Sequence, residues 1–194
     1  MRYSARLVEA FSFAHDLHKD QERKASGAPY ITHLMGVAAI VGRHGGTEDQ
    51  VIAALLHDAV EDQGGAATLE RIRERFGETV AAYVDGCSDT DTKPKPPWEE
   101  RKREFLEGTV DAPPDLKLIV AADKLHNART LANTLRVQGN AAWDLFRGGR
   151  DGTLWYFAEI VRALATGWSH PVLHELAEAV DALHRAASQL NGVP

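Results

Sequence analysis

The chain has 194 residues, of which 44% are hydrophobic and 26% are charged, and its formal net charge is −6 at pH 7. This length can bury a sizeable core, and because no Ser-, Pro- or Gly-rich linker interrupts it, we expect one domain over residues 1–194. The acidic balance argues against a nucleic-acid partner, because proteins that bind duplexes neutralise many phosphates with a broad basic surface.

Membrane segments and disulfides are also not expected. No apolar run approaches the roughly 20 residues that a helix needs to cross a bilayer, and acidic residues at positions 9 and 16 precede any signal-like apolar core. The single Cys87 excludes an internal disulfide and a zinc site built from thiolates. We therefore expect a cytoplasmic protein that holds any metal ion with nitrogen and oxygen ligands. The sequence allows a homo-oligomer.

The first 46 residues predict two helices joined by a loop. Apolar residues at spacings of three and four predict an amphipathic helix over residues 3–18. We place His15 and His18 on its surface, because no carboxylate lies at ligand spacing from them. The loop QERKASGAPYITH follows, and Thr32 at its end can cap a second helix with His33 in its first turn.

A helix from about residue 49 to residue 62 carries the most informative residues of the chain. Its first half is apolar on nearly every side, which is typical of a helix inside a core. At about 100° per residue, its polar end falls within one arc of roughly 140°. That end consists of His57, Asp58, Glu61 and Asp62. Buried carboxylates need a cation, a proton or a metal ion, although His57 and Asp58 alone are explained by a hydrogen bond at a helix end.

The middle of the chain predicts two covering helices, over residues 68–76 and 78–87, and then a loop over residues 88–97 that we place over the site. A charged helix over residues 98–107 follows. Basic residues gather in two clusters, each of which is either an anion-binding site or a solvated charged face. The clusters are Arg23 with Lys24, and Lys93 and Lys95 with Arg101, Lys102 and Arg103.

A long helix that begins at Asp115 supplies a second chemical signal. Its apolar face runs into three polar side chains at spacings of three or four, which are Asp123, Asn127 and Thr130. A carboxylate that continues an apolar stripe points toward the core. Asp123 alone is explained by burial with a hydrogen bond. With His33, His57 and Asp58 it completes a set of two histidines and two aspartates that can hold a divalent cation.

The rest of the chain predicts two more helices, over residues 153–166 and 170–190, after a glycine-rich interruption. His174 and Glu175 begin like a zincin HExxH motif, but Glu178 stands where the second histidine would be, so we expect a surface there. The sequence shows no alternating strand pattern, no phosphate-binding glycine motif and no repeat. The predicted fold class is all-α.

Four motifs resemble, in the same order, the hydrolase domain of the RelA/SpoT alarmone enzymes, a branch of the HD phosphohydrolase superfamily. They are RKASGAPYITH, ALLHDAVED, FGETVAAYVDG and AADKLHNARTL. They cover roughly residues 5–135, and the length has no room for a synthetase domain. The resemblance implies an HD-type helical bundle and a stand-alone small alarmone hydrolase of the metazoan type.

This resemblance implies removal of the 3′-pyrophosphate from ppGpp or pppGpp, with one Mn²⁺ ion as cofactor. The residues that match the metal ligands are His33, His57, Asp58 and Asp123. Glu61 and Asp62 match the pair that handles the attacking water. The substrate-binding matches are Arg23 and Lys24 for the base, Asn127 and Thr130 for the nucleoside pocket, and Tyr156 for a further family tyrosine.

The residue chemistry agrees with hydrolysis of a phosphoester. A divalent ion can lower the pKa of a bound water from 15.7 toward about 7 and neutralise a phosphoryl oxygen. Histidine and carboxylate ligands admit manganese, iron or zinc, so the choice of manganese rests on the resemblance. Glu61 is placed to orient or deprotonate the water, and Asp62 to assist proton transfer. Lys24 and the second basic cluster are the candidates for attracting the diphosphate.

Three departures from the family bear on the base, and one of them is the loop DTDTKPKPPWEERK, which differs from the usual version. Leu34 follows His33 where the family usually has proline, and the RK motif carries one residue more than in the long bacterial enzymes. Adenosine analogues such as ppApp and pppApp are therefore also candidate substrates. The alternatives are another HD-family nucleotide phosphohydrolase, acting on a 5′-nucleotide or NADPH, and a non-catalytic alarmone-binding regulator. The pair of Glu61 and Asp62 argues against a pure binder, which has no need of it.

Overall fold

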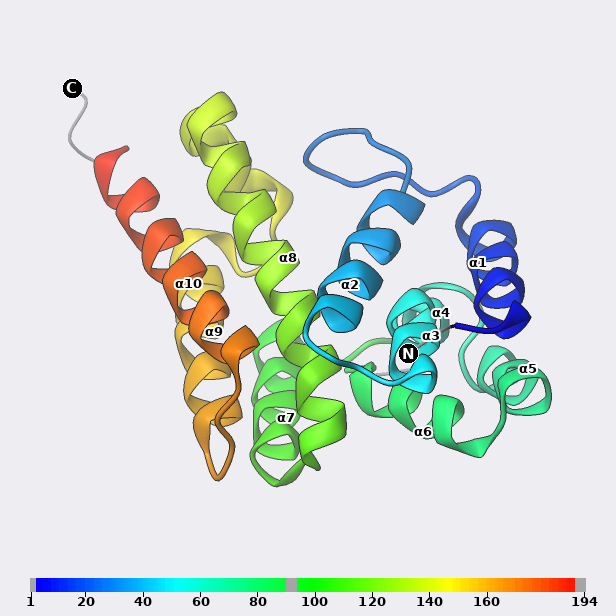
Figure 1. Cartoon of the computed structure of the whole chain (residues 1–194). Helices are drawn as coiled ribbons and strands as arrows, with labels where there is room; N and C mark the ends of the chain where they lie inside the picture. Colours follow the sequence, from blue (N-terminus) through cyan, green and yellow to red (C-terminus); the bar gives the residue numbers. More distant parts are fainter. Residues whose placement is uncertain (1–2, 90–93, 191–194) are drawn as a thin grey trace.

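The computed structural model describes residues 3–89 and 94–190, and over these ranges the fold is all-α, as predicted (Figure 1). No helix in these ranges is long and apolar enough to cross a membrane. The elements are α1 (Ala5–His18), α2 (Ile31–Arg43), α3 (Glu48–Leu56), α4 (Ala59–Asp62), α5 (Ala66–Phe76), α6 (Glu78–Cys87), α7 (Trp98–Asp111), α8 (Pro114–Gln138), the 3₁₀ helix η1 (Gly139–Leu145), α9 (Gly149–Ala165) and α10 (Pro171–Gln189).

The long helix α8 is the centre of the fold. It packs against α2, α3 and α6 on one side and against α9 and α10 on the other, as Figure 1 shows. Helix α3 is the most deeply buried element, because every residue from Gln50 to Leu56 is buried. The buried apolar side chains form one continuous cluster. This packing brings α2, the end of α3 and the middle of α8 close together.

Several helices begin at the residue that capping chemistry favours. The Ser4 hydroxyl accepts a hydrogen bond from the backbone N–H of Arg6 at the start of α1, and Thr47 forms a reciprocal capping box with Gln50 at the start of α3. Thr32 does not cap α2 as predicted. Helix α2 begins at Ile31, so Thr32 lies within its first turn, and the Thr32 hydroxyl instead donates to the carbonyl oxygen of Pro29.

The predicted continuous helix over residues 49–62 is wrong in one respect that matters. Helix α3 ends at Leu56, His57 and Asp58 form a turn, and the short helix α4 follows. The Nδ1 atom of His57 lies 2.8 Å from the backbone oxygen of Ala54, so the imidazole folds back onto α3. The two residues keep helix-like backbone angles, and their side chains therefore still point to one side.

Two further expectations need correction. His18 is not on the surface: it is only 2% exposed and its ring stacks on that of Tyr30, whereas His15 is exposed as predicted. Gly149 and Gly152 do not interrupt the chain but lie within α9. Trp98 packs closely enough that a Cβ at Gly152 would lie 3.2 Å from its ring, so the absence of a side chain there permits the contact.

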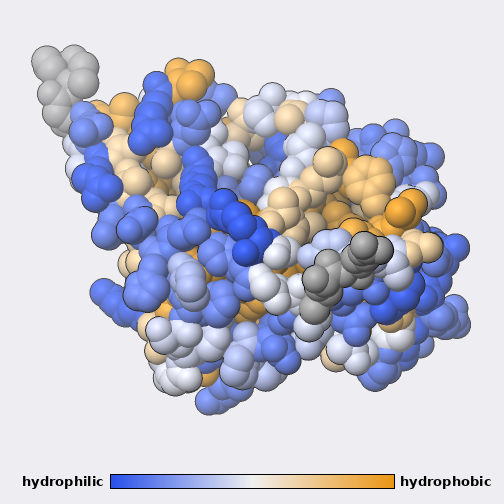
Figure 2. Space-filling model, viewed as in Figure 1, coloured by the Kyte–Doolittle hydropathy of each residue, from blue (hydrophilic) through white to orange (hydrophobic). Residues whose placement is uncertain are grey.

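One patch of the molecular surface is apolar. Figure 2 shows apolar surface over α1 and α2, whereas most of the rest of this view is polar. Val8, Phe11 and Met35 are exposed apolar side chains of these two helices. They line a groove that shares no residue with the polar pocket described below.

The contact between α2 and α8 generates a stability prediction. A Cβ at Gly36 would lie 2.4 Å from Nε2 of His126, whereas no atom lies within 4 Å of a Cβ at Gly108 on the exposed face of α7. We expect Gly36→Ala to lower the free energy of unfolding by about 1–3 kcal/mol, because the added methyl group overpacks the interface. Urea denaturation measures this change.

The matched control is Gly108→Ala. This change should leave stability unaltered or raise it by up to about 1 kcal/mol, because alanine is a better helix former than glycine. A Gly36→Ala protein as stable as the parent would contradict the close approach of α2 and α8.

Candidate active site

Two histidines and two aspartates converge where α2, the α3–α4 turn and α8 meet. His33, His57, Asp58 and Asp123 are called the His–Asp cluster below. The Nε2 atom of His33 lies 3.5 Å from Oδ2 of Asp58 and 3.3 Å from Oδ1 of Asp123. The Nε2 atom of His57 lies 3.1 Å and 3.5 Å from the same two oxygens. The structure thus brings together all four residues that the sequence analysis grouped.

The hydrogen bonds of the two imidazoles decide what their Nε2 atoms can do. A carbonyl oxygen only accepts, so the Nδ1 atom of His57, which faces Ala54, carries a proton. Burial, His33 and Arg23 lower the pKa of His126 to about 4. The neutral His126 can accept from Nδ1 of His33, 2.9 Å away. In the neutral form, both histidines therefore direct an Nε2 lone pair into the cluster.

Lone pairs and carboxylate oxygens that face one another need a shared positive charge. Both histidines are no more than 2% exposed, and Nε2 of His57 has no hydrogen-bond partner within residues 3–89 and 94–190. Burial lowers the pKa of His57, but Asp58 and Asp123 raise it more, so it lies well above its usual value. A proton or a metal ion can supply the charge. Two imidazole nitrogens and two carboxylates in a buried setting suit a divalent cation.

Outer contacts hold the two carboxylates of the cluster. The hydroxyl of Tyr30 donates to Oδ2 of Asp58 at 2.6 Å. The Asp123 carboxylate accepts from Nδ2 of Asn127 at 2.6 Å and from Nζ of Lys124 at 2.7 Å. Such contacts fix the orientation of potential ligands. The sequence analysis missed Tyr30 and Lys124, although both lie inside the motifs that it singled out.

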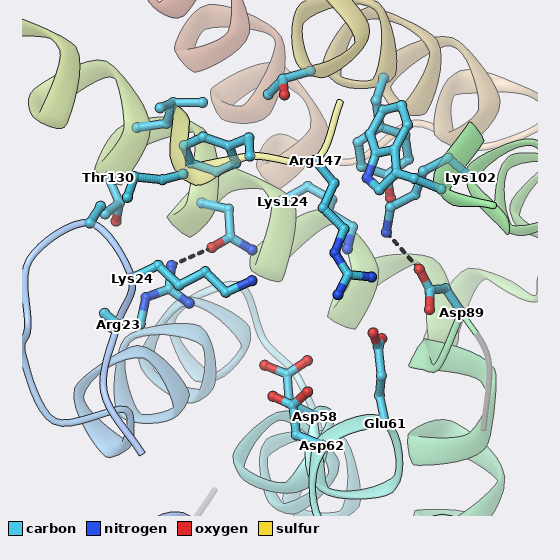
Figure 3. Close-up of a pocket in the computed structure, with 18 of the residues that line it drawn as sticks. Arg23, Lys24, Asp58, Glu61, Asp62, Asp89, Lys102, Lys124, Thr130 and Arg147 are labelled. Carbon is cyan, nitrogen blue, oxygen red and sulfur yellow. Dashed lines mark hydrogen bonds and ion pairs between the residues drawn. The ribbon is translucent and has the colours of Figure 1, made fainter. Parts of the chain in front are cut away.

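A pocket of about 510 Å³ opens beside the His–Asp cluster (Figure 3). Of the four cluster residues, only Asp58 lines it. The sequence-predicted site residues that line it as well are Glu61, Asp62, Arg23, Lys24, Asn127, Thr130 and Tyr156. Figure 3 shows Asp58, Glu61 and Asp62 on one wall, with Arg23 and Lys24 to one side and Asp89 and Lys102 to the other. The pocket therefore brings the predicted catalytic acids together with the predicted substrate-binding residues.

The two acids after Asp58 have different surroundings. Glu61 is partly buried, and Nζ of Lys95 donates to its Oε1 at 2.8 Å. Burial and the nearby Asp89 raise the pKa of Glu61, while Lys95 and Lys102 oppose that shift. Asp62 is exposed and accepts from Nε2 of Gln21 at 2.8 Å. The surroundings of Glu61 therefore tune the ionisation of its carboxyl group.

The second basic cluster only partly faces the pocket. Lys95, Arg101 and Lys102 line it, and the last two bind Asp89, a residue that the sequence analysis did not single out. Arg103 is 59% exposed, pairs with Glu99 and belongs to the solvated face. Lys93 lies outside the described residues.

The aromatic wall of the pocket is built around Tyr156. This residue is buried, its hydroxyl has no hydrogen-bond partner among the residues that the structure describes, and Nζ of Lys102 lies 4.9 Å from the centre of its ring. Trp98 packs edge-on against the same ring. An apolar wall beside several cations suits a ligand that carries both an aromatic group and negative charge.

Comparison with known proteins identifies the fold family. Residues 10–147, most of the chain, match the HD domain family. The chain belongs to this HD domain family. The His–Asp cluster lies within the matched range, and the helical bundle is the architecture that the resemblance implied.

Several curated relatives of this HD domain protein carry the same hydrolase activity in their names. The guanosine-3′,5′-bis(diphosphate) 3′-pyrophosphohydrolase MESH1 of Mus musculus is 43% identical over 131 residues, which are 66% of this chain and 70% of that protein. A guanosine-3′,5′-bis(diphosphate) 3′-pyrophosphohydrolase of Aquifex aeolicus is 37% identical over 131 residues, but these are only 18% of its length. The predicted resemblance to alarmone hydrolases is confirmed.

A solved structure extends the likeness over nearly the whole chain. It is described as a metazoan ortholog of SpoT that hydrolyzes ppGpp, and it superposes with a TM-score of 0.79 at 28% sequence identity. The match covers 96% of this chain and 99% of the other. The helices α9 and α10, which lie beyond the family match, therefore also belong to the shared fold.

The buried pair of Arg101 and Asp89 generates a stability prediction. The two side chains are 5% and 4% exposed. We expect Arg101→Ala to lower the free energy of unfolding by about 3–5 kcal/mol, because it leaves a buried carboxylate with less compensation. Thermal or urea unfolding measures the loss.

Arg103→Ala on the same helix is the control and should cost less than about 1 kcal/mol, since its ion pair with Glu99 is exposed. If both variants lost the same free energy of unfolding, the burial of Arg101 would make no contribution to stability.

Proposed function

We propose that this protein is a metal-dependent hydrolase that removes the 3′-pyrophosphate from (p)ppGpp-type alarmones. The observation that carries the proposal is the His–Asp cluster at the edge of a pocket with basic and aromatic walls. The names of its HD domain relatives give the substrate class. We further propose Mn²⁺ as the ion, and the whole of residues 1–194 as one hydrolase domain.

In this proposal His33, His57, Asp58 and Asp123 hold the ion. When bound, a divalent ion lowers the pKa of water and neutralises a phosphoryl oxygen. The two Nε2 lone pairs and the two carboxylates offer ligand atoms of the types that manganese accepts. The outer hydrogen bonds from Tyr30 and Lys124 keep the carboxylates in place.

Glu61 acts on the water in this proposal. Its ionised carboxylate accepts a proton while the water oxygen bonds to phosphorus and the bond to the 3′-oxygen breaks. The departing 3′-oxygen takes a proton, with Asp62 assisting the transfer. The products are pyrophosphate and a nucleotide with a free 3′-hydroxyl. Lys95 holds the Glu61 carboxylate and favours its ionised form by lowering its pKa.

The other end of the pocket binds the nucleoside. Arg23 and Lys24 are the proposed contacts to the base, Asn127 and Thr130 line the nucleoside pocket, and Tyr156 supplies an aromatic wall. Lys24, Lys95 and Lys102 attract the phosphates in a protein whose net charge is negative. Guanosine and adenosine alarmones are both candidate substrates.

One assay panel tests the proposal against its alternatives. The substrates are ppGpp, ppApp, NADPH and nucleoside monophosphates, each with added Mn²⁺ and with a chelator. Release of pyrophosphate from ppGpp or ppApp, lost with the chelator, would support the proposal. Orthophosphate release from NADPH or a monophosphate alone would favour another HD-family phosphohydrolase. Binding of ppGpp without turnover would favour a regulator.

Two substitutions separate metal binding from water activation. We expect His57→Ala to abolish both turnover and Mn²⁺ retention, because it removes a ligand. Glu61→Ala should keep Mn²⁺ but lower kcat by about 10²–10⁴-fold, the usual contribution of a general base. Steady-state kinetics and metal analysis of the purified variants measure these effects.

Glu178→Ala on the exposed side of α10 is the control and should leave both measurements unchanged. Full activity in Glu61→Ala would remove Glu61 from the proposed mechanism.

The surroundings of Glu61 also predict a pH effect. Glu61 acts in its ionised form, so kcat should fall as the pH drops through its pKa. Lys95 and Lys102 lower this pKa, whereas burial and Asp89 raise it. Lys95→Ala removes one lowering charge, and the acidic limb of the kcat profile should therefore move to higher pH.

The measurement is kcat against pH for the parent, Lys95→Ala and the exposed control Lys19→Ala, whose profile should match that of the parent. A limb that stays in place, or moves to lower pH, in Lys95→Ala would contradict the assignment of that limb to Glu61.

A further inference from the structure

Arg23, proposed above as a contact to the base, is joined to the His–Asp cluster through an amide. Its Nη2 atom donates to Oδ1 of Asn127 at 2.7 Å, and Nδ2 of Asn127 donates to Oδ1 of Asp123 at 2.6 Å. Chemistry fixes this amide orientation, because a guanidinium can only donate and a carboxylate can only accept. Both polar ends of the Asn127 side chain are therefore in use.

A second chain of contacts joins Arg23 to the other carboxylate. The guanidinium lies 5.4 Å from the centre of the Tyr30 ring, within the range of a cation–π interaction. The hydroxyl of the same tyrosine donates to Oδ2 of Asp58 at 2.6 Å. His18 stacks on Tyr30 with 5.2 Å between ring centres, which limits the movement of the ring.

Both chains end on the carboxylate oxygens that face the histidines. Oδ1 of Asp123 lies 3.3 Å from Nε2 of His33, and Oδ2 of Asp58 lies 3.1 Å from Nε2 of His57. A displacement of Asn127 or Tyr30 therefore moves oxygens that face the cation position.

We infer that Arg23 positions the carboxylates of Asp123 and Asp58 through Asn127 and Tyr30, and so couples the nucleoside end of the pocket to cation binding at the His–Asp cluster. The inference rests on the proposed function. Asn127 then acts as a positioning residue, since its amide is already committed at both ends. By reciprocity, a nucleotide that holds Arg23 in place strengthens cation binding, and the bound cation strengthens nucleotide binding.

The sign of one effect separates this coupling from simple electrostatics. Removing a positive charge near a cation site should strengthen cation binding through space. If Arg23 contacts only substrate, Arg23→Ala therefore leaves Mn²⁺ affinity unchanged or increases it in nucleotide-free protein. If Arg23 supports the carboxylates, the same change weakens Mn²⁺ binding.

The experiment measures the Mn²⁺ dissociation constant of nucleotide-free protein by the electron paramagnetic resonance signal of the free ion. We expect Asn127→Ala to weaken binding about 10-fold, as is usual for loss of a partner that orients a metal ligand. Arg23→Ala, one contact further away, should weaken it about 3-fold. The double variant should lose less than the product of the two single effects, because both changes break one chain.

Tyr30→Phe tests the second chain and should also weaken Mn²⁺ binding, because it deletes only the hydroxyl that holds Asp58. The matched controls are Asn140→Ala and Tyr83→Phe, which lie outside the pocket and should keep the parent dissociation constant. Circular dichroism and a thermal melt of every variant establish that each is folded.

The outcomes separate the coupling from the proposed function. Unchanged or tighter Mn²⁺ binding in a folded Arg23→Ala protein, or fully multiplicative effects in the double variant, would overturn the coupling while the parent still binds Mn²⁺. Parent protein that binds no Mn²⁺ would instead contradict the proposed cation site itself.

Discussion

The rest of the site depends on the need to place positive charge between two buried imidazoles and two carboxylates. The Nδ1 atoms of His33 and His57 face His126 and a backbone oxygen, so in the neutral form both Nε2 atoms present lone pairs to Asp58 and Asp123. Without a proton or a metal ion, this arrangement sets acceptors against one another in a nearly dry setting. The fold holds these groups in place from three separate segments, which is consistent with a preorganised cation site.

Several positive charges in and beside the pocket are paired with carboxylates. Lys124 pairs with Asp123, Lys95 with Glu61, and Arg101 and Lys102 with Asp89. An acidic protein can thereby present several cations to a polyanionic ligand without leaving them mutually repelling in the free state. The same pairs hold the carboxylates that the proposed chemistry requires, so substrate attraction and catalytic geometry share the same contacts.

Much of this arrangement could be predicted from the sequence, for reasons that particular residues make clear. Apolar periodicity located the helices, and the stripe that leads into Asp123 correctly placed that carboxylate toward the core. The break after Leu56 was missed, because the residues on both sides of it have a helix-like composition. The burial of His18 was missed as well, since its stacking on Tyr30 is a contact between an early helix and a loop.

The supporting residues were the hardest to anticipate. Tyr30 and Asp89 lie within or beside recognised motifs, but their roles come from partners on other elements of the fold, whereas Lys124 pairs with its chain neighbour Asp123, a contact that depends on side-chain direction. Asn127 was assigned to the nucleoside pocket, and only its paired contacts with Arg23 and Asp123 reveal that its amide is occupied on both sides. A sequence pattern indicates which residues lie on the buried face of a helix. Contacts that bridge two elements depend on how those elements pack, which the pattern does not give.

The seclusion of the His–Asp cluster has a kinetic consequence for the proposed enzyme. Asp58 alone among the four side chains borders the open pocket, so that pocket is the evident route by which an ion would enter or escape. A nucleotide bound in the pocket would block this route and so prevent dissociation of the ion during each turnover. Chelators could then remove the ion only from the nucleotide-free enzyme. An enzyme saturated with substrate would therefore retain its metal ion even where free metal is scarce.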